Sequence, residues 1–196
     1  MSLFQNVTGS PGSWLSSTNE ESDIVLSCRI RLARNLRKIK FPEYMSSNDA
    51  EKIKESIKSA IPFCPALTNP ELYEMNKLPN LERLILIERH LISKQLAGKK
   101  DGMLIVNADE KLSVMINEED HLRIQCFLPG LQLEECYRRA QTIDDELEKN
   151  LNFAFDERRG YLTSCPTNVG TGMRASVMLH LPAIVFSGQT NHIFHN

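Results

Sequence analysis

Three segments of the chain alternate between apolar and polar residues, and the polar positions of each segment include arginine. The segments are Leu26–Ala33, His121–Phe127 and Arg174–Leu181. Successive side chains of a β-strand point to opposite faces of a sheet, so each segment predicts a strand with one apolar and one cationic face. The cationic positions are Arg29 and Arg31, then Arg123, then Arg174. This pattern predicts a sheet with one buried face and several positive charges on the other.

Helical spacing of apolar residues predicts three helices. The first is capped by Ser47 or Asn48 and ends before Pro62, the second runs from Leu81 to about His90, and the third covers about 132–151. The apolar run of the second also fits a strand. A hairpin is predicted from Met103–Asn107 and Leu112–Asn117, and a further strand near 161–164.

These elements predict an α+β fold with a largely antiparallel sheet and helices on one face. Residues 1–22, rich in Ser, Asn, Gly and Pro, are expected to form an irregular lead-in to one domain over 23–196.

Length and composition exclude several classes of protein. The 196 residues, 41% hydrophobic and 24% charged, suit one globular domain rather than a disordered or fibrous chain. A net charge of −2 argues against a dedicated nucleic-acid binder. We find no apolar run of about 18 residues and no secretory signal, so we expect no membrane association. Five scattered cysteines without a Cys-x-x-Cys pair argue against a disulfide framework or zinc site, and the expected location is the cytoplasm.

The four arginines on the polar strand positions predict an anionic ligand. Arginine is rarely buried without a partner, and its guanidinium fork matches phosphate oxygens. Neither a P-loop nor a G-x-G-x-x-G motif occurs, so arginine side chains would have to make the phosphate contacts. The competing interpretation is a solvated sheet face with ordinary surface charges.

Two further features suggest chemistry. Glu118, Glu119 and Asp120 are consecutive, and adjacent carboxylates repel one another. They fit either a site for a cationic substrate or Mg²⁺, or an exposed acidic turn. Cys165 precedes a Pro-Thr-Asn-x-Gly loop and fits either a reactive thiol or a small buried side chain.

The basic segment from Arg29 to Lys40 also fits nucleic acid. Its strand alternation and its lack of interleaved aromatic residues make that interpretation the weaker one.

Three motifs resemble the ATP:guanido phosphotransferase family, which includes creatine kinases, arginine kinases and bacterial protein-arginine kinases. They are Ser27–Arg31, Asn117–Arg123 and Cys165–Ser176. The likeness runs from about residue 20 to about 185 and implies the catalytic-domain fold of that family. Family members continue with another strand and an Arg-Gly-containing nucleotide loop, so the chain is expected to be the N-terminal part of that domain, truncated at its C-terminus.

The resemblance also implies roles for individual residues. Glu119 matches the carboxylate that holds the acceptor guanidinium, and Cys165 matches the thiol beside it. The cofactors implied are ATP and Mg²⁺, with no residue assigned as a metal ligand. The implied ATP-binding residues are Ser27, Cys28, Arg29, Ile30, Arg31, His90, Arg123, Arg174, Ala175, Ser176, Val177 and Met178.

Within the family, the resemblance favours the protein-arginine kinase branch. Phosphagen kinases carry a helical domain before the Ser-x-Arg-x-Arg strand, which begins here at residue 27. That branch implies arginine-bearing protein substrates in stress response and protein quality control. It also implies that the chain self-associates and that its partners include an activator protein, a heat-shock repressor and a Clp-type protease ATPase. The alternatives are a phosphagen-type kinase acting on free arginine or another guanidino metabolite, and a non-catalytic nucleotide- or protein-binding module.

Overall fold

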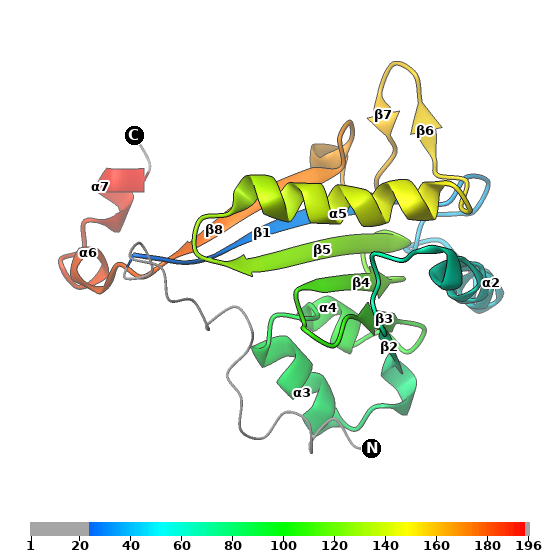
Figure 1. Ribbon diagram of the computed structural model, residues 1–196, viewed down its shortest axis with the longest axis horizontal. Coiled ribbons are helices and arrows are strands. Elements are labelled where there is room, and N and C mark those ends of the chain that lie inside the picture. Colours follow the sequence, from blue (N-terminus) through cyan, green and yellow to red (C-terminus); the bar gives the residue numbers. More distant parts are fainter. Residues whose placement is uncertain (1–23, 195–196) are drawn as a thin grey trace.

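A six-stranded sheet organises residues 24–194, the part of the chain that the computed structural model describes (Figure 1). The strand order is β2-β3-β4-β5-β1-β8, and every neighbouring pair is antiparallel. The strands are β1 (Val25–Arg34), β2 (Glu71–Glu74), β3 (Met103–Val106), β4 (Leu112–Ile116), β5 (Leu122–Pro129) and β8 (Met173–Leu179). The lead-in expected over 1–22 lies outside the described residues. The predicted antiparallel α+β architecture is confirmed.

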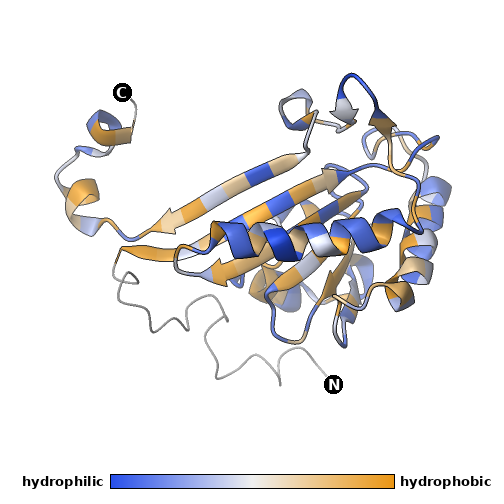
Figure 2. Ribbon diagram, turned by 45° about the horizontal axis from the view of Figure 1, so that its top comes forward, coloured by the Kyte–Doolittle hydropathy of each residue, from blue (hydrophilic) through white to orange (hydrophobic). Residues whose placement is uncertain are grey.

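The apolar parity of β1 and β5 forms the centre of the main hydrophobic core. Cys28, Ile30 and Leu32 of β1 are almost completely buried, as are Ile124 and Cys126 of β5. The long helix α5 (Leu133–Glu148) lies across these strands and buries its own apolar stripe against them (Figure 1). The apolar face predicted for β1 and β5 is therefore confirmed, and Figure 2 shows hydrophilic and hydrophobic residues alternating along the strands. The buried apolar face predicted for β8 is wrong: Ala175, Val177 and Leu179 are exposed, because β8 is the edge strand of the sheet.

Helix α2 (Ser47–Ala60) packs its predicted stripe into the same core. Its N-cap is Ser46, one residue before the predicted Ser47 or Asn48. Ser46 Oγ accepts a hydrogen bond from Asp49 N at 3.2 Å, and Asp49 Oδ2 accepts one from Ser46 N at 3.3 Å. This reciprocal capping box satisfies two main-chain donors that the first helical turn leaves open.

The cap yields a prediction about stability. Replacing Ser46 with alanine should lower the free energy of unfolding by about 1 kcal/mol, because Asp49 N loses its acceptor at an exposed helix start. Urea unfolding of the two proteins measures the difference. Ser59→Ala is the matched control, since the Ser59 hydroxyl donates only to Glu55 O within the same helix. An equal loss in both variants would contradict a specific capping effect.

Helices cover both faces of the sheet, and the prediction of helices on one face is therefore wrong. Helices α3 (Asn80–Glu88) and α4 (Lys94–Ala97) pack against Leu104, Val106 and Met115, which point away from α5. The alternation of β3 and β4 could not show this, because both of their faces are buried. On this second face α3 and α4 cover only the β2–β4 side, beside the arginine-bearing strands.

The segment after α5 departs from the prediction of a strand near 161–164. This segment forms a small hairpin of β6 (Phe155–Asp156) and β7 (Gly160–Tyr161), with isolated antiparallel bridges from Phe153 to Leu36 and from Tyr161 to Gly170. Beyond Tyr161 the main chain bonds elsewhere: Leu162 N donates to Ala154 O, and Ser164 N donates to a side chain, Asp120 Oδ1. Two short helices, α6 (Pro182–Phe186) and α7 (Thr190–Phe194), follow β8. None of the described helices is long and apolar enough to cross a membrane.

Candidate active site

Strand β1 lies between β5 and β8, and this order brings the arginines of three strands onto one face. Arg31 lies directly opposite Arg174 of β8. Two residues further along β1, Ala33 lies opposite Arg123 of β5, and Arg29 occupies the same face two residues before Arg31. Directly opposed residues of a sheet point to the same side. The convergence that the alternation predicted is therefore present.

The acidic turn after β4 meets this cluster through Arg123. The Arg123 guanidinium donates to Glu118 Oε1 and to Glu119 Oε2, both at 2.7 Å. Glu118 is buried and also accepts from Ser93 Oγ at 2.5 Å, whereas Glu119 remains partly exposed. Arg123 thus fixes the orientation of the Glu119 carboxylate at the edge of the cationic cluster.

The remaining arginines repel one another. Burial, together with the charges of Arg174 and Arg123, lowers the pKa of Arg29. Burial and the neighbouring guanidinium groups lower the pKa of Arg31 to about 10. The Nε of Arg31 is also buried without a hydrogen-bond partner among the described residues. Clustered, partly desolvated cations with an open donor are suited to bind a polyanion.

A small cavity of about 50 Å³ lies where the arginines and the acidic turn meet. Its rim combines strand residues with the loop before β8, in which Pro166–Asn168 forms one 3₁₀ turn. The lining residues are Arg31, Ala33, Glu119, Arg123, Asn168, Gly172 and Arg174. With one carboxylate beside three guanidinium groups, the lining provides charges that suit a phosphate group next to a cationic one.

The three consecutive acids do not form an exposed turn. Glu118 and Asp120 are both buried, and only Glu119 reaches the cavity. Of the two interpretations left open by the sequence, the exposed acidic turn is wrong. Glu118 is a site residue that the sequence did not identify. Three consecutive acidic residues look alike in the sequence, and nothing there shows which one is buried and bonded to Arg123.

Cys165 stands at the start of the 3₁₀ turn. Of the five cysteines, all of which lie among residues 24–194, Cys165 is the only one that is not buried. Its Sγ lies 3.0 Å from Thr167 Oγ1. The interpretation of Cys165 as a buried small side chain is therefore wrong, and this partly exposed residue lies on the same loop as Asn168 of the cavity.

His90 and Phe127 border the cluster on the α3 side. Their rings meet edge to face at 6.0 Å, and the Arg29 guanidinium lies 5.9 Å from the Phe127 ring centroid. Burial, and then the charge of Arg29, lower the pKa of His90. His90 follows α3 with a positive φ of 59°, and its carbonyl accepts from Gln125 Nε2 at 2.9 Å. A neutral imidazole thus lies beside the arginines.

The other residues assigned to nucleotide binding divide between the two faces. Ser176 and Met178 share the arginine face, and Arg29 Nε donates to Ser176 Oγ at 3.4 Å. Ser27, opposite Met178, is buried, and its hydroxyl has no partner among the described residues. The other four assigned residues lie on the opposite face: Cys28 and Ile30 are buried in the core beneath α5, whereas Ala175 and Val177 of the edge strand β8 are exposed.

The basic segment Arg29–Lys40 does not act as one patch. Arg34 is buried and donates to Asp144 Oδ2 of α5 at 2.6 Å, with its guanidinium carbon 3.5 Å from the Tyr161 ring centroid. Its Nη1 donates to Thr171 O at 3.0 Å, which ties the loop before β8 to β1. Arg34 is therefore a packing residue, and the segment lacks the continuous cationic surface that nucleic-acid binding needs.

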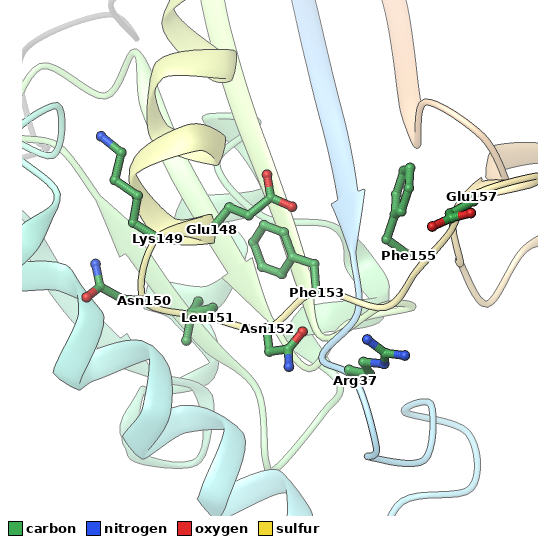
Figure 3. A pocket seen from close by; sticks show the side chains of 9 residues that line it. All are labelled: Arg37, Glu148, Lys149, Asn150, Leu151, Asn152, Phe153, Phe155 and Glu157. Atoms are coloured by element: carbon green, nitrogen blue, oxygen red, sulfur yellow. The ribbon is translucent and has the colours of Figure 1, made fainter.

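Larger depressions of the surface lie elsewhere. A groove of about 570 Å³ lies at the C-terminal end of α5, and Figure 3 shows Arg37, Glu148 and Phe155 among the side chains that line it. No residue that the sequence assigned to the site lines it. Its lining combines Arg37 and Lys149 with Glu148 and Glu157, and these mixed charges give it no preference for an anion.

Comparison with known proteins agrees with this geometry. The family model described as "ATP:guanido phosphotransferase, C-terminal catalytic domain" matches residues 50–196. The chain belongs to the ATP:guanido phosphotransferase family. Its fold is that of the duplicated taurocyamine kinase from Schistosoma mansoni, with a TM-score of 0.78 at 26% identity over 90% of this chain and 26% of that one. Lombricine kinase superposes with a TM-score of 0.70 at 24% identity, over 93% of this chain and 55% of that one.

Higher identity is found with proteins named protein-arginine kinase. The one from Syntrophomonas wolfei is 57% identical over 188 residues, which are 93% of this chain and 52% of that protein. The one from Bacillus subtilis is 47% identical over 195 residues, 98% of this chain and 54% of that protein. The chain thus spans about half the length of the curated relatives it matches.

Proposed function

We propose that this chain carries the ATP and guanidine sites of a protein-arginine kinase, which transfers the γ-phosphate of ATP to arginine side chains of proteins. The observation that supports this best is the meeting of Arg31, Arg123 and Arg174 with Glu119 around one cavity. A triphosphate needs several cations, and an arginine acceptor needs an acid opposite them. The relatives with 47–57% identity support arginine in proteins as the acceptor.

The acceptor nitrogen has to be oriented and deprotonated. A guanidinium has a pKa above about 12 and is a poor nucleophile while protonated. Glu119 accepts hydrogen bonds from the acceptor guanidinium and takes its proton as the new N–P bond forms. The bond between the γ-phosphorus and the bridging oxygen breaks in the same step, and ADP leaves. Direct transfer of this kind requires no covalent enzyme intermediate.

The arginine face stabilises the charge of the transferred group. Arg29, Arg31, Arg123 and Arg174 neutralise the triphosphate and the negative charge that develops on the equatorial oxygens. The Cys165 thiol lies beside the acceptor and steers its reacting nitrogen electrostatically. Ser27, His90, Ser176 and Met178 border the rest of the nucleotide. The side chains of Cys28 and Ile30 support β1 from the core side, whereas Ala175 and Val177 lie on the exposed face of β8 that is opposite the arginines.

ATP reaches kinases as its magnesium complex, so the fit of Mg²⁺ has to be considered. Among residues 24–194, no three His, Cys, Asp or Glu side chains are grouped so that they could hold a metal ion. The described residues therefore offer no protein cage for Mg²⁺. We assign the charge neutralisation to the arginines and no step to a metal.

A second candidate function is a kinase of a free guanidino metabolite. The structural neighbours named taurocyamine kinase and lombricine kinase favour it, at lower identity than the protein-arginine kinases. Incubating the chain with ATP and either free arginine or an arginine-rich protein distinguishes the two by ³¹P detection of acid-labile phosphate. The full-length relative from Syntrophomonas wolfei is the positive control. Phosphoarginine on the protein is expected, and phosphate on free arginine alone would contradict the proposal.

The family resemblance extends this proposal to partners and location. We propose a cytoplasmic protein that acts in stress response and protein quality control, with self-association, an activator protein, a heat-shock repressor and a Clp-type protease ATPase as partners. Affinity capture with each purified partner tests these separately from catalysis.

Nucleotide affinity gives a direct test of the exposed end of the cluster. Replacing Arg174 with alanine should weaken ATP binding about fivefold, because one partly solvated phosphate contact is worth about 1 kcal/mol. Titration with a fluorescent ATP analogue measures this. Arg138→Ala is the matched control, since Arg138 is an exposed arginine of α5 paired with Glu135. Equal affinities in the three proteins would remove Arg174 from the phosphate site.

A further inference from the structure

Asp120 joins the two halves of the acceptor site through buried hydrogen bonds. Its Oδ1 accepts from Ser164 N at 2.7 Å, and Ser164 directly precedes Cys165. Asp120 itself directly follows Glu119. A single carboxylate oxygen therefore links the turn that carries the acid to the loop that carries the thiol.

A second residue, Asn35, connects Asp120 and the loop after β7 to the end of β1 by hydrogen bonds. Asn35 Nδ2 donates to Asp120 Oδ1 at 2.6 Å and to Leu162 O at 3.1 Å. Asn35 Oδ1 accepts from His121 N at 2.9 Å. The Asn35 amide thus holds both the acidic turn and the loop after β7, and its side chain can satisfy all of these contacts in one orientation.

The imidazole of His121 completes the buried network. His121 Nδ1 accepts from Leu36 N at 2.9 Å, so the ring proton lies on Nε2, which is 2.9 Å from Lys40 O. Asn35, Asp120 and His121 are each at most 1% exposed. Buried polar groups that share several hydrogen bonds have little freedom to move, because a displacement leaves further donors or acceptors unpaired.

We propose that Asp120 is a positioning residue that sets the separation of Glu119 and Cys165 around one acceptor guanidinium. The catalytic consequence of this inference rests on the proposed function. The positioning of the Cys165 loop by Asp120 does not depend on that function. Glu119 lines the cavity from the β4–β5 turn, and Cys165 starts the loop before β8 whose Asn168 also lines the cavity. These segments are distant in the sequence, and Asp120 bridges them directly at the site.

Loss of this bridge should lower turnover more than ATP binding. In Asp120→Ala, Ser164 N loses its acceptor, the Cys165 loop shifts away from Glu119, and kcat falls roughly 10- to 100-fold. The arginines bind ATP from the sheet face, so the KM for ATP stays within about twofold. A uniform loss of folding would instead reduce the amount of active protein and leave the kcat of the remainder unchanged.

Alkylation of Cys165 reports the loop position without any turnover. Because the other four cysteines are buried, iodoacetamide should modify Cys165 first in the folded chain, and mass spectrometry measures its rate. In Asp120→Ala the rate should rise several-fold. Asp109→Ala is the matched control, because Asp109 Oδ1 also accepts a main-chain hydrogen bond, from Lys111 N, but lies in the β3–β4 turn.

The conservative variant separates position from charge. Asp120 Oδ2 has no hydrogen-bond partner among the described residues, so Asp120→Asn leaves both accepted hydrogen bonds in place. Both kcat and the Cys165 alkylation rate should then stay within about twofold of the original chain. If the alanine variant does not fold, Asp120→Ser, whose side chain is too short to hold both donors, replaces it.

Two results would overturn the proposal. One is an alkylation rate of Cys165 that is the same in folded Asp120→Ala, or Asp120→Ser, as in the original chain. The other is an equal loss of kcat in the alanine and asparagine variants, which would assign the effect to charge. If the original chain makes no phosphoarginine while the alkylation rates differ as expected, the proposed function fails and the bridge stands.

Discussion

Replacing Glu119 with glutamine is expected to reduce phosphoarginine formation roughly 10²- to 10⁴-fold, the scale on which a general base contributes. In the original chain the Arg123 guanidinium donates to Glu119 Oε2 at 2.7 Å, and glutamine keeps an oxygen that can accept this hydrogen bond. It cannot take the proton of the acceptor nitrogen. The variant should therefore retain the cavity and its arginines and lose only the proton transfer.

Two measurements separate this effect from general damage. ATP affinity, measured by titration, should stay within about twofold of the original value. Glu135→Gln is the matched control, because Glu135 also bonds to arginines, Arg138 and Arg139, but on the exposed side of α5. It should leave phosphoarginine formation unchanged. Turnover by Glu119→Gln at the original rate would show that the acid has been misassigned.

The alternation of the strands predicted much of this site. Because side chains of a strand alternate between faces, the sequence alone separated Arg29 and Arg31 from Cys28 and Ile30. The same rule placed Arg123 and Arg174 on cationic faces, and the register confirms that Arg31 and Arg174 share one face. The rule could not predict the strand order, because β1 pairs with β5 and β8, segments that are distant in the sequence.

The sequence patterns could not predict which charged side chains are buried. Glu118, Asp120 and Arg34 look like surface charges in the sequence, and each is buried with partners from other segments. Burying a charge is unfavourable unless such partners are present, and only the tertiary structure supplies them. The second helical face was missed for a related reason, since strands buried on both sides lose the alternation that identifies an exposed face.

Replacing Arg31 with methionine is expected to act with opposite signs on stability and on ATP binding. Without nucleotide, Arg31 is repelled by Arg29, Arg123 and Arg174, and its buried Nε has no partner among the described residues. Its folded-state pKa of about 10 lies below the ordinary value of 12.5, so its protonated form disfavours folding at neutral pH. Methionine removes the charge and fills similar space, and the melting temperature should rise by roughly 2–4 °C.

ATP binding should weaken roughly 10- to 100-fold in the same variant, because a central charge-assisted contact to phosphate is lost. Thermal shift at a series of ATP concentrations measures both effects, since ATP stabilises only the protein that binds it. Arg138→Met, on the exposed side of α5, should change neither quantity. A lower melting temperature with unchanged ATP affinity would show that Arg31 serves packing. The expected pair of opposite changes would mean that the charge repulsion in this sheet face is tolerated because the triphosphate relieves it.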